Sequence, residues 1–195
     1  MRKVLYIFGL LTDADIEWMA RIGHRRKISD GEILIEEGGE SDWLILLLEG
    51  EVQVSAKGYG RVARMGAGEI IGEISLVDSA PPSATIAALG DGHALFLDKA
   101  QLLQKLADDE GFGSRFYKAL AVFLADRLRA TRQTTAKVLT DVAALPRDEL
   151  DFDIVDQVAA AGERFNRMLG ILRQQSRERA SDALAGTSQK QVEHR

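Results

Sequence analysis

Residues 68–88 read Gly68-Glu-Ile-Ile-Gly-Glu-Ile-Ser-Leu-Val-Asp-Ser-Ala-Pro-Pro-Ser-Ala-Thr-Ile-Ala-Ala88, a strand-like pattern that is interrupted and then resumes. Residues 68–74 are an apolar run punctuated by glycine, and residues 83–88 alternate small and β-branched side chains as a half-buried strand does. Between them, Pro81 and Pro82 have no N–H to donate to a sheet. The interruption therefore leaves main-chain N–H groups that face water or a ligand, and an anion suits them. A plain corner of a β-roll would show the same pattern.

Turn signals surround this stretch on both sides. From Arg25 to Asp98 glycines recur about every 8–12 residues, which predicts many short strands in a roll or barrel. Residues 43–48 are apolar at every position, as expected for a central strand that is buried on both faces. We expect Gly50 and residues 89–93 to break strands. The pattern therefore predicts a β-roll.

The glycines and their neighbours keep a regular spacing. The positions that carry it are Gly31, Gly38, Asp42, Leu44, Gly50, Val52, Gly68, Gly72, Glu73, Ser83, Ala84 and Thr85. This pattern resembles the cyclic-nucleotide-binding domain family, of the catabolite activator protein and protein kinase A regulatory subunit type, over roughly residues 10–140. The resemblance implies an α+β fold, an eight-stranded double-stranded β-helix (jelly-roll-like) with an N-terminal helix and long C-terminal helices.

The resemblance also implies a ligand site. In the family the interrupted stretch is a phosphate-binding cassette, in which a Gly-Glu pair holds the ribose and an Arg before two small residues holds the cyclic phosphate. Some members contact the base from about the position of Thr131, although an ordinary polar position on a helix seam is the alternative for this residue. The candidate ligand-binding residues are Gly72, Glu73, Ile74, Ser75, Ser83, Ala84 and Thr131.

One position departs from that pattern, because Pro82 stands where the family has its Arg. A guanidinium offers a full charge and a fork of donors, so its loss is expected to weaken binding of a cyclic phosphate by about 1.5–3 kcal/mol. We expect Arg61 and Arg64 to be solvated. The alternative is that one of them reaches the cassette and replaces the missing cation.

Helical signals flank the predicted roll. Thr12 is a predicted N-cap for a helix over residues 14–22, and Asp98 caps a helix over residues 99–108 that Gly111 and Gly113 interrupt. A long helix is predicted over residues 114–144. Coiled-coil spacing within it joins Leu128, Thr131, Thr135, Val138, Val142 and Leu145. Because the family dimerises through a helix in this place, we expect a homodimer with a coiled-coil seam.

These signals divide the chain into four parts. We predict a β-roll with an N-terminal helix over residues 1–109, a dimerisation helix over 110–145, an amphipathic helix over 146–180 and a disordered tail over 181–195. The third part carries a heptad-like apolar face made of Ile154, Val158, Ala161, Phe165, Met168 and Leu172. Its arginines indicate a solvated face, or alternatively a surface for an acidic protein partner.

Composition excludes several classes of function. A net charge of −5 and a pI near 5.3 argue against a DNA-binding protein. The segment after Pro146 also lacks the winged helix-turn-helix of the family's transcription factors. The chain has no cysteine, which favours a cytoplasmic protein and excludes a thiolate metal site. No stretch approaches the ~20 apolar residues of a membrane span. We expect no catalytic residues and no metal, since zinc-ligand spacing, nucleophile elbows, P-loops and a complete calcium loop are missing.

Two functional hypotheses remain from the sequence. The first is a dimeric, non-enzymatic sensor in which a cyclic nucleotide lies between the cassette and the long helix. The second is an interaction protein on the same fold that works without a ligand, because Pro82 replaces the Arg. Another small anion, such as a cyclic dinucleotide, is neither supported nor excluded.

Overall fold

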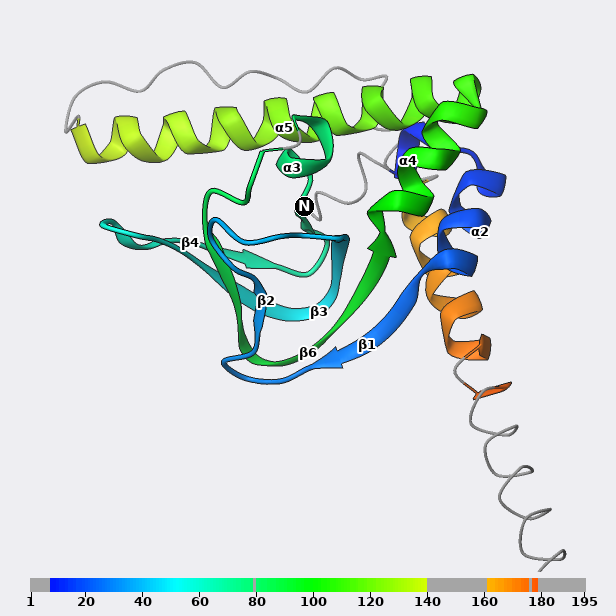
Figure 1. The fold of residues 1–195 in the computed structure, drawn as a ribbon, viewed down its shortest axis with the longest axis horizontal. Coiled ribbons are helices and arrows are strands. Elements are labelled where there is room, and N and C mark those ends of the chain that lie inside the picture. The colour runs from blue at the N-terminus through cyan, green and yellow to red at the C-terminus, as the bar shows by residue number, and fades with distance from the viewer. Residues whose placement is uncertain (1–7, 79, 140–160, 176, 179–195) are drawn as a thin grey trace, which may run out of the picture.

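A computed structural model describes residues 8–78, 80–139, 161–175 and 177–178. The elements in chain order are α2 (Asp13–Ile22), β1 (His24–Ile28), β2 (Ile33–Ile35), β3 (Trp43–Ala56), β4 (Gly60–Gly66), β5 (Ile70–Ile71), α3 (Ile74–Val77), β6 (Thr85–Asp98), α4 (Lys99–Asp108) and α5 (Glu110–Leu139). Residues 8–10 and 161–175 are also helical. Figure 1 shows α5 crossing above the sheet, while α2, α4 and residues 161–175 gather at one end.

All strand pairs of the sheet are antiparallel, and its main path runs β1-β6-β3-β4, with β2 on β6 and β5 on β3. The α+β class is therefore confirmed. The described residues form six strands rather than the eight expected, because β3 and β6 each run for 14 residues. The expected double-stranded β-helix topology is not confirmed by this strand count.

The strand breaks predicted at Gly50 and residues 89–93 are wrong, and close packing of the two long strands explains why. Gly50 has a φ of +91°, and a Cβ placed on Gly92 would lie 2.4 Å from the Glu49 carbonyl oxygen. The β3–β6 pairing changes register on both sides of Glu49. Glycine thus lets two continuous strands bend past each other, where a sequence pattern indicates separate strands.

The alternation of β3 separates two hydrophobic cores. Ile45 and Leu47 face the interior of the roll, whereas Leu44, Leu46 and Leu48 face the helices. Each of these side chains is 4% exposed or less. A strand with both faces buried was predicted from this apolar run, and that prediction is confirmed.

The helix starts follow capping chemistry. Thr12 caps α2 in a reciprocal capping box with Asp15, and Asp98 caps α4 by accepting a hydrogen bond from the Gln101 N–H at 2.9 Å. Both caps were predicted. The predicted start of the long helix at residue 114 is wrong, since α5 begins at Glu110 and includes Gly111 and Gly113 in its first turn. The chain turns at Asp109, whose carboxylate accepts from the Phe112 N–H at 2.8 Å.

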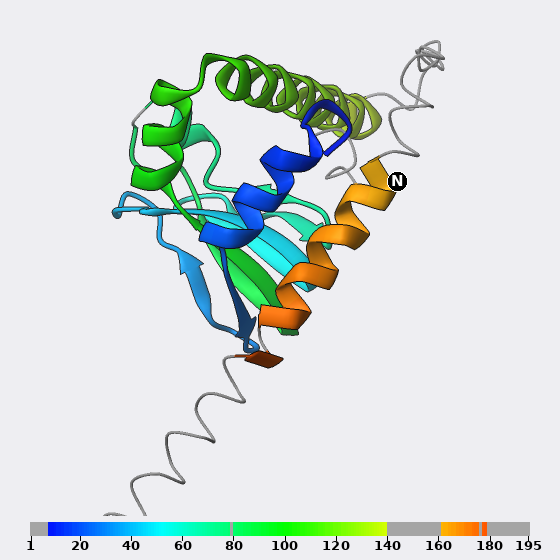
Figure 2. The same cartoon turned by 90° about the vertical axis from the view of Figure 1, so that its right-hand side faces the viewer.

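We call α2, α4, the first two turns of α5 and residues 161–175 the helical end. Figure 2 shows residues 161–175 running beside α2. The apolar face of this C-terminal segment is buried in the same core as Phe8 and the sheet; its buried members are Ala161, Phe165, Met168 and Leu172. The Phe8 and Phe165 ring centroids lie 5.7 Å apart. The chain itself therefore covers the described part of this apolar face.

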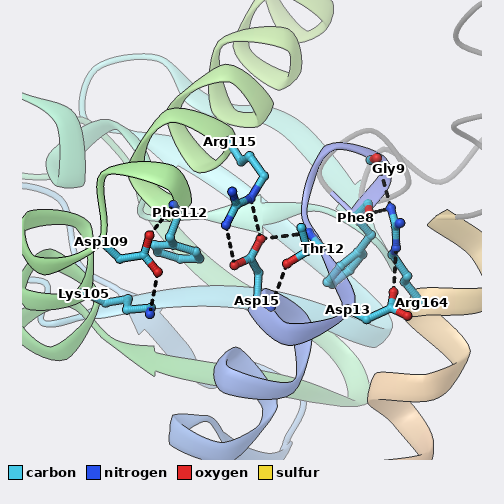
Figure 3. Close-up of polar contacts among 10 residues, drawn as sticks. All are labelled: Phe8, Gly9, Thr12, Asp13, Asp15, Lys105, Asp109, Phe112, Arg115 and Arg164. Carbon is cyan, nitrogen blue, oxygen red and sulfur yellow. Dashed lines mark hydrogen bonds and ion pairs between the residues drawn. The ribbon is translucent and has the colours of Figure 1, made fainter.

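Two carboxylates of α2 fasten the helical end in different directions (Figure 3). Asp15 accepts from Arg115 Nε at 2.7 Å and from its Nη2 at 2.9 Å, and so joins α2 to α5. Asp13 accepts from Arg164 Nε at 2.9 Å and pairs with Arg167. The Arg164 Nη1 also donates to the carbonyls of Phe8 and Gly9, both at 3.1 Å. The basic side of the C-terminal segment is thus partly used within the chain.

These ion pairs lower the pKa values of both carboxyl groups. The hydrogen bond from Arg164 is the main cause that lowers the pKa of Asp13 below its ordinary value. Burial by itself raises the pKa of Asp15, but the hydrogen bonds from Arg115 and Thr12 together outweigh it and leave that pKa lowered. Both groups therefore favour the fold in their ionised form.

Candidate functional site

The cassette, which we define as residues 72–84, leaves the sheet immediately after β5. Gly72 has a φ of +84°, and a Cβ there would lie 2.8 Å from the Trp43 carbonyl oxygen. Only glycine combines this left-handed backbone with so close an approach. The chain then forms the single turn of α3, and returns to β6 through Pro81 and Pro82. The predicted excursion between two strands is thus present.

The far end of the cassette is held by the turn between β2 and β3. The Gly38 N–H donates to the Pro82 carbonyl at 2.8 Å, and the Glu37 N–H donates to the Thr85 hydroxyl at 3.1 Å. The far end of the excursion is therefore tied to the β2–β3 turn by hydrogen bonds, while its near end packs closely against the Trp43 carbonyl at Gly72. Such anchoring keeps the loop open over the roll instead of letting it collapse into a hairpin.

A cavity of about 690 Å³ lies under the cassette. Its lining comes from β2, β3, β4, β6, the cassette and α5: Ile35, Val54, Ala56, Val62, Ala63, Arg64, Met65, Glu69, Gly72, Glu73, Ile74, Ser75, Pro81, Pro82, Ser83, Ala84, Ile86 and Arg127. Six of the predicted ligand-binding residues, Gly72, Glu73, Ile74, Ser75, Ser83 and Ala84, thus meet at one place. The volume lies within the ~300–1,000 Å³ typical of small-molecule sites. The side chain of Thr131 lies outside the described residues, so its role stays a prediction.

The strongest polar contact at the cavity joins the cassette to α5. Glu73 Oε1 accepts a hydrogen bond from Arg127 Nη1, and its side chain is only 3% exposed. Burial raises the pKa of Glu73 above its ordinary value, and the attraction of Arg127 only partly opposes it. The same guanidinium contacts Met65 Sδ at 2.6 Å and lies 3.9 Å from Glu69 Oε2. One arginine of the long helix therefore faces two buried carboxylates of the sheet side.

A buried lysine supports the cassette from below. Lys99, the first residue of α4, donates from Nζ to the Ser75 hydroxyl at 2.7 Å and to the Ser41 carbonyl at 2.7 Å. The Ser75 hydroxyl in turn donates to the Gly72 carbonyl at 3.3 Å. Burial lowers the pKa of Lys99, against the opposing attraction of Asp42 and Glu73. Ser75 is therefore engaged in holding the cassette, besides lining the cavity.

Arg61 and Arg64, considered as replacements for the missing cassette cation, differ in their distance from the cavity. Arg61 and Arg64 are both exposed on β4, as expected for solvated side chains, although Arg64 borders the cavity. Sequence reasoning missed Arg127 and Lys99. Arg127 lies three residues after Leu124 on an otherwise ordinary helix, and no local motif marks it. Its partner Glu73 lies 54 positions away in the sequence, so only the folded arrangement of α5 over the cassette reveals the contact.

Other site classes find no support in the residues that the structure describes. That part of the chain contains no group of three or more His, Cys, Asp or Glu side chains arranged to hold a metal ion. Among its helices, none combines the length and the apolar character needed to cross a bilayer.

Comparison with known proteins relates this geometry to one family. The cyclic nucleotide-binding domain family matches residues 25–109, which include the whole cassette and the strands around it. A cAMP-dependent protein kinase regulatory subunit of Blastocladiella emersonii is 29% identical over 147 residues, which are 72% of this chain and 35% of that protein. Residues 25–109 of this chain are therefore similar to the cyclic nucleotide-binding domain family.

Solved structures share the fold. A cyclic nucleotide-binding domain from Methylobacillus flagellatus is 25% identical with a TM-score of 0.62, covering 74% of this chain and 85% of that one. The catabolite activator protein of Thermus thermophilus, at 22% identity and a TM-score of 0.55, covers 88% of both chains and shows likeness of fold. The chain spans between 9% and 38% of the lengths of the curated relatives that it matches.

Proposed function

We propose that this chain is a non-enzymatic sensor module that binds a cyclic nucleotide between the cassette and α5. One observation carries the proposal: a single cavity collects the cassette main chain, the buried Glu73 carboxylate and the Arg127 guanidinium. Its apolar wall, with Ile35, Val54 and Ile86, suits the flat face of a base. The name of the Blastocladiella emersonii relative, a cAMP-dependent regulatory subunit, supports the same ligand class.

In this proposal each candidate residue has a separate role. Glu73 accepts hydrogen bonds from the ribose hydroxyls, and the main chain near Ser83 and Ala84, with the Ser83 hydroxyl, holds the phosphate. Gly72 lets the backbone come close, while Ile74 and Ser75 complete the cassette wall. A ligand bound there shifts α5 only if it binds one arrangement of the helix better than another. The output of the sensor is therefore the position of α5.

Calorimetric titration with cyclic AMP and cyclic GMP tests the proposal. We expect heat of binding for at least one of them, and we expect Glu73→Gln to lower its affinity at least about tenfold through loss of a charge-assisted hydrogen bond. Glu51→Gln is the matched control, since that carboxylate is exposed on β3. No heat from either nucleotide at millimolar concentration would overturn the proposal.

The oligomeric part of the proposal concerns α5 and the segment that follows it. We propose that residues 110–145 form the dimerisation helix of a cytoplasmic homodimer, built on a double-stranded β-helix roll. The exposure of Leu128, at 56%, supports an apolar contact on this helix. Sedimentation equilibrium should give a dimer that Leu128→Glu converts to a monomer. A monomeric wild-type chain would contradict this part alone.

A second candidate function has its own observation. Arg127 already pairs with the Glu73 carboxylate, and Pro82 offers no cation, so the polar groups of the cavity are partly satisfied by the chain itself. A ligand-independent interaction module could use the arginines of residues 146–180 toward an acidic protein; Arg173 and Arg177 are exposed. An absence of nucleotide heat in both wild type and Pro82→Arg would favour this function, because the cavity would then be unable to accept the ligand at all.

A further inference from the structure

The lining of the cavity does not provide a cation where the phosphate of the ligand is expected. A cyclic phosphate is an anion, yet the cassette offers Pro82, Ser83 and Ala84, and no cation, at the place where the anion is expected. The cavity is also bordered by the buried carboxylates of Glu69 and Glu73. Two carboxylates and an incoming phosphate make three negative groups, so binding of the ligand needs a cation that can reach the phosphate.

Two arginines line the cavity, and they differ in how they are held. Arg64 is exposed on β4, where a charge is screened by water. The Arg127 side chain is 26% exposed and is fixed by contacts with Glu73, Met65 and Glu69. Its Cζ lies 5.3 Å from the centroid of the Phe123 ring on the same helix. Arg127 is therefore the better preorganised of the two cations.

We infer that Arg127 binds the anionic group of the ligand, so that the phosphate is recognised from α5 rather than from the cassette. This inference rests on the proposed function. When the ribose hydroxyls take the Glu73 carboxylate, the Arg127 guanidinium loses part of its present partner and its fork of N–H donors turns to the phosphate. A guanidinium binds phosphate bidentately, which a main-chain donor alone does not.

The exchange of partners transfers the cation from Glu73 to the phosphate, and the bound site carries one more negative charge than the free site. Before binding, Glu73 and Arg127 neutralise each other; after binding, Glu73 accepts neutral hydroxyl donors and Arg127 neutralises the phosphate. Because Arg127 belongs to α5, the ligand's charge pulls directly on the long helix. A neutral nucleoside has the same base and sugar but lacks that pull. The arginine thus determines the preference for a phosphate-bearing ligand and couples that preference to the helix.

Calorimetry with cyclic AMP and adenosine separates this role from a structural one. We expect Arg127→Gln to weaken cyclic AMP binding at least about tenfold while adenosine affinity stays within about twofold. Arg129→Gln is the control, since Arg129 is exposed on the same helix and does not line the cavity. Adding Pro82→Arg to Arg127→Gln should restore at least part of the lost cyclic AMP affinity, because it returns a cation to the cavity.

The outcomes distinguish the inference from the proposed function. Cyclic AMP binding that survives Arg127→Gln overturns the inference and leaves the sensor intact. An equal loss for cyclic AMP and adenosine also overturns it, because the arginine would then only shape the cavity. A wild-type chain that binds neither compound overturns the sensor, and the inference with it.

Discussion

Two arginine–carboxylate pairs tie the long helix α5 to the rest of the molecule, in addition to the hydrophobic core that its apolar residues share with the sheet. At the helical end, Arg115 pairs with Asp15. Asp15 makes four hydrogen bonds there, two with Arg115 and two with Thr12. Twelve residues later, about 18 Å along the helix, Arg127 meets Glu73 beside the cavity. The pKa of Asp15 is lowered, whereas burial raises the pKa of Glu73.

The opposite directions of the two pKa shifts reflect different surroundings of the two carboxylates. Asp15 gains enough hydrogen bonds to compensate its burial, so its pair stabilises the fold. Glu73 is left with an unfavourable burial that a ligand can relieve by supplying further donors. We propose that the first pair is a permanent attachment and that the second is one that an incoming ligand can exchange.

The largest expected effect tests how firmly the helical end is fastened. Phe165→Ala removes a ring that is 3% exposed and packs on Phe8, so we expect it to lower the free energy of unfolding by about 3–5 kcal/mol. Chemical denaturation followed by circular dichroism measures this. Asn166→Ala, at an exposed neighbouring position, should change it by less than about 0.5 kcal/mol. Equal stability of both variants would mean that Phe165 does not pack against Phe8 in the core.

The next effect concerns the Asp15 pair itself. Asp15→Asn removes the charge that binds Arg115 and weakens the capping box with Thr12, so we expect a loss of about 2–3 kcal/mol. This value is discounted from that of a fully buried pair, because the Arg115 side chain is 35% exposed. Denaturation of Asp13→Asn provides the comparison, since Asp13 is 48% exposed and should matter less. A loss under 1 kcal/mol for Asp15→Asn would refute a permanent attachment.

The pH dependence should distinguish the two carboxyls by sign. Asp15 has a lowered pKa in the fold, so its contribution is present above its unfolded pKa and is lost as the pH falls through its folded pKa, below about pH 4. Glu73 has a raised pKa, so its contribution is present below its unfolded pKa and is lost as the pH rises through its folded pKa. Stability of wild type relative to Asp15→Asn should therefore increase with pH, and relative to Glu73→Gln it should decrease. Parallel pH profiles for the two variants would remove the distinction between the pairs.

The smallest expected effect on stability belongs to Glu73. Glu73→Gln removes a buried charge whose burial is unfavourable, and Arg127 keeps contact with water through a side chain that is 26% exposed. We expect a change within about 1 kcal/mol of wild type at neutral pH, in either direction. Thermal unfolding without ligand measures it. A loss as large as that of Asp15→Asn would show that the pair is structural and unsuited to exchange.

Local patterns predicted much of the fold and of the cassette. Capping residues such as Thr12 and Asp98 mark helix starts through contacts within a few residues, and the apolar run at 43–48 marks a buried strand. The same reasoning failed at Gly50, where contact with Gly92 permits a bend instead of a break. It also missed Arg127, since the partner of that side chain depends on how α5 lies over the roll. Predicted contacts after residue 139, including the seam positions Val142 and Leu145, the start of the 146–180 helix and the 181–195 tail, lie outside the described residues.

The distribution of aromatic residues gives the helical end and the roll separate optical reporters. The chain has two tryptophans. The Trp18 ring centroid lies 5.4 Å from that of Phe112 in the helical end, whereas the Trp43 ring on β3 lies 6.1 Å from His24 and 6.1 Å from Phe96 in the roll. Replacing one tryptophan at a time would yield two proteins whose emission spectra report separately on the helical end and on the roll. Events in these two regions could then be followed independently and without any attached dye.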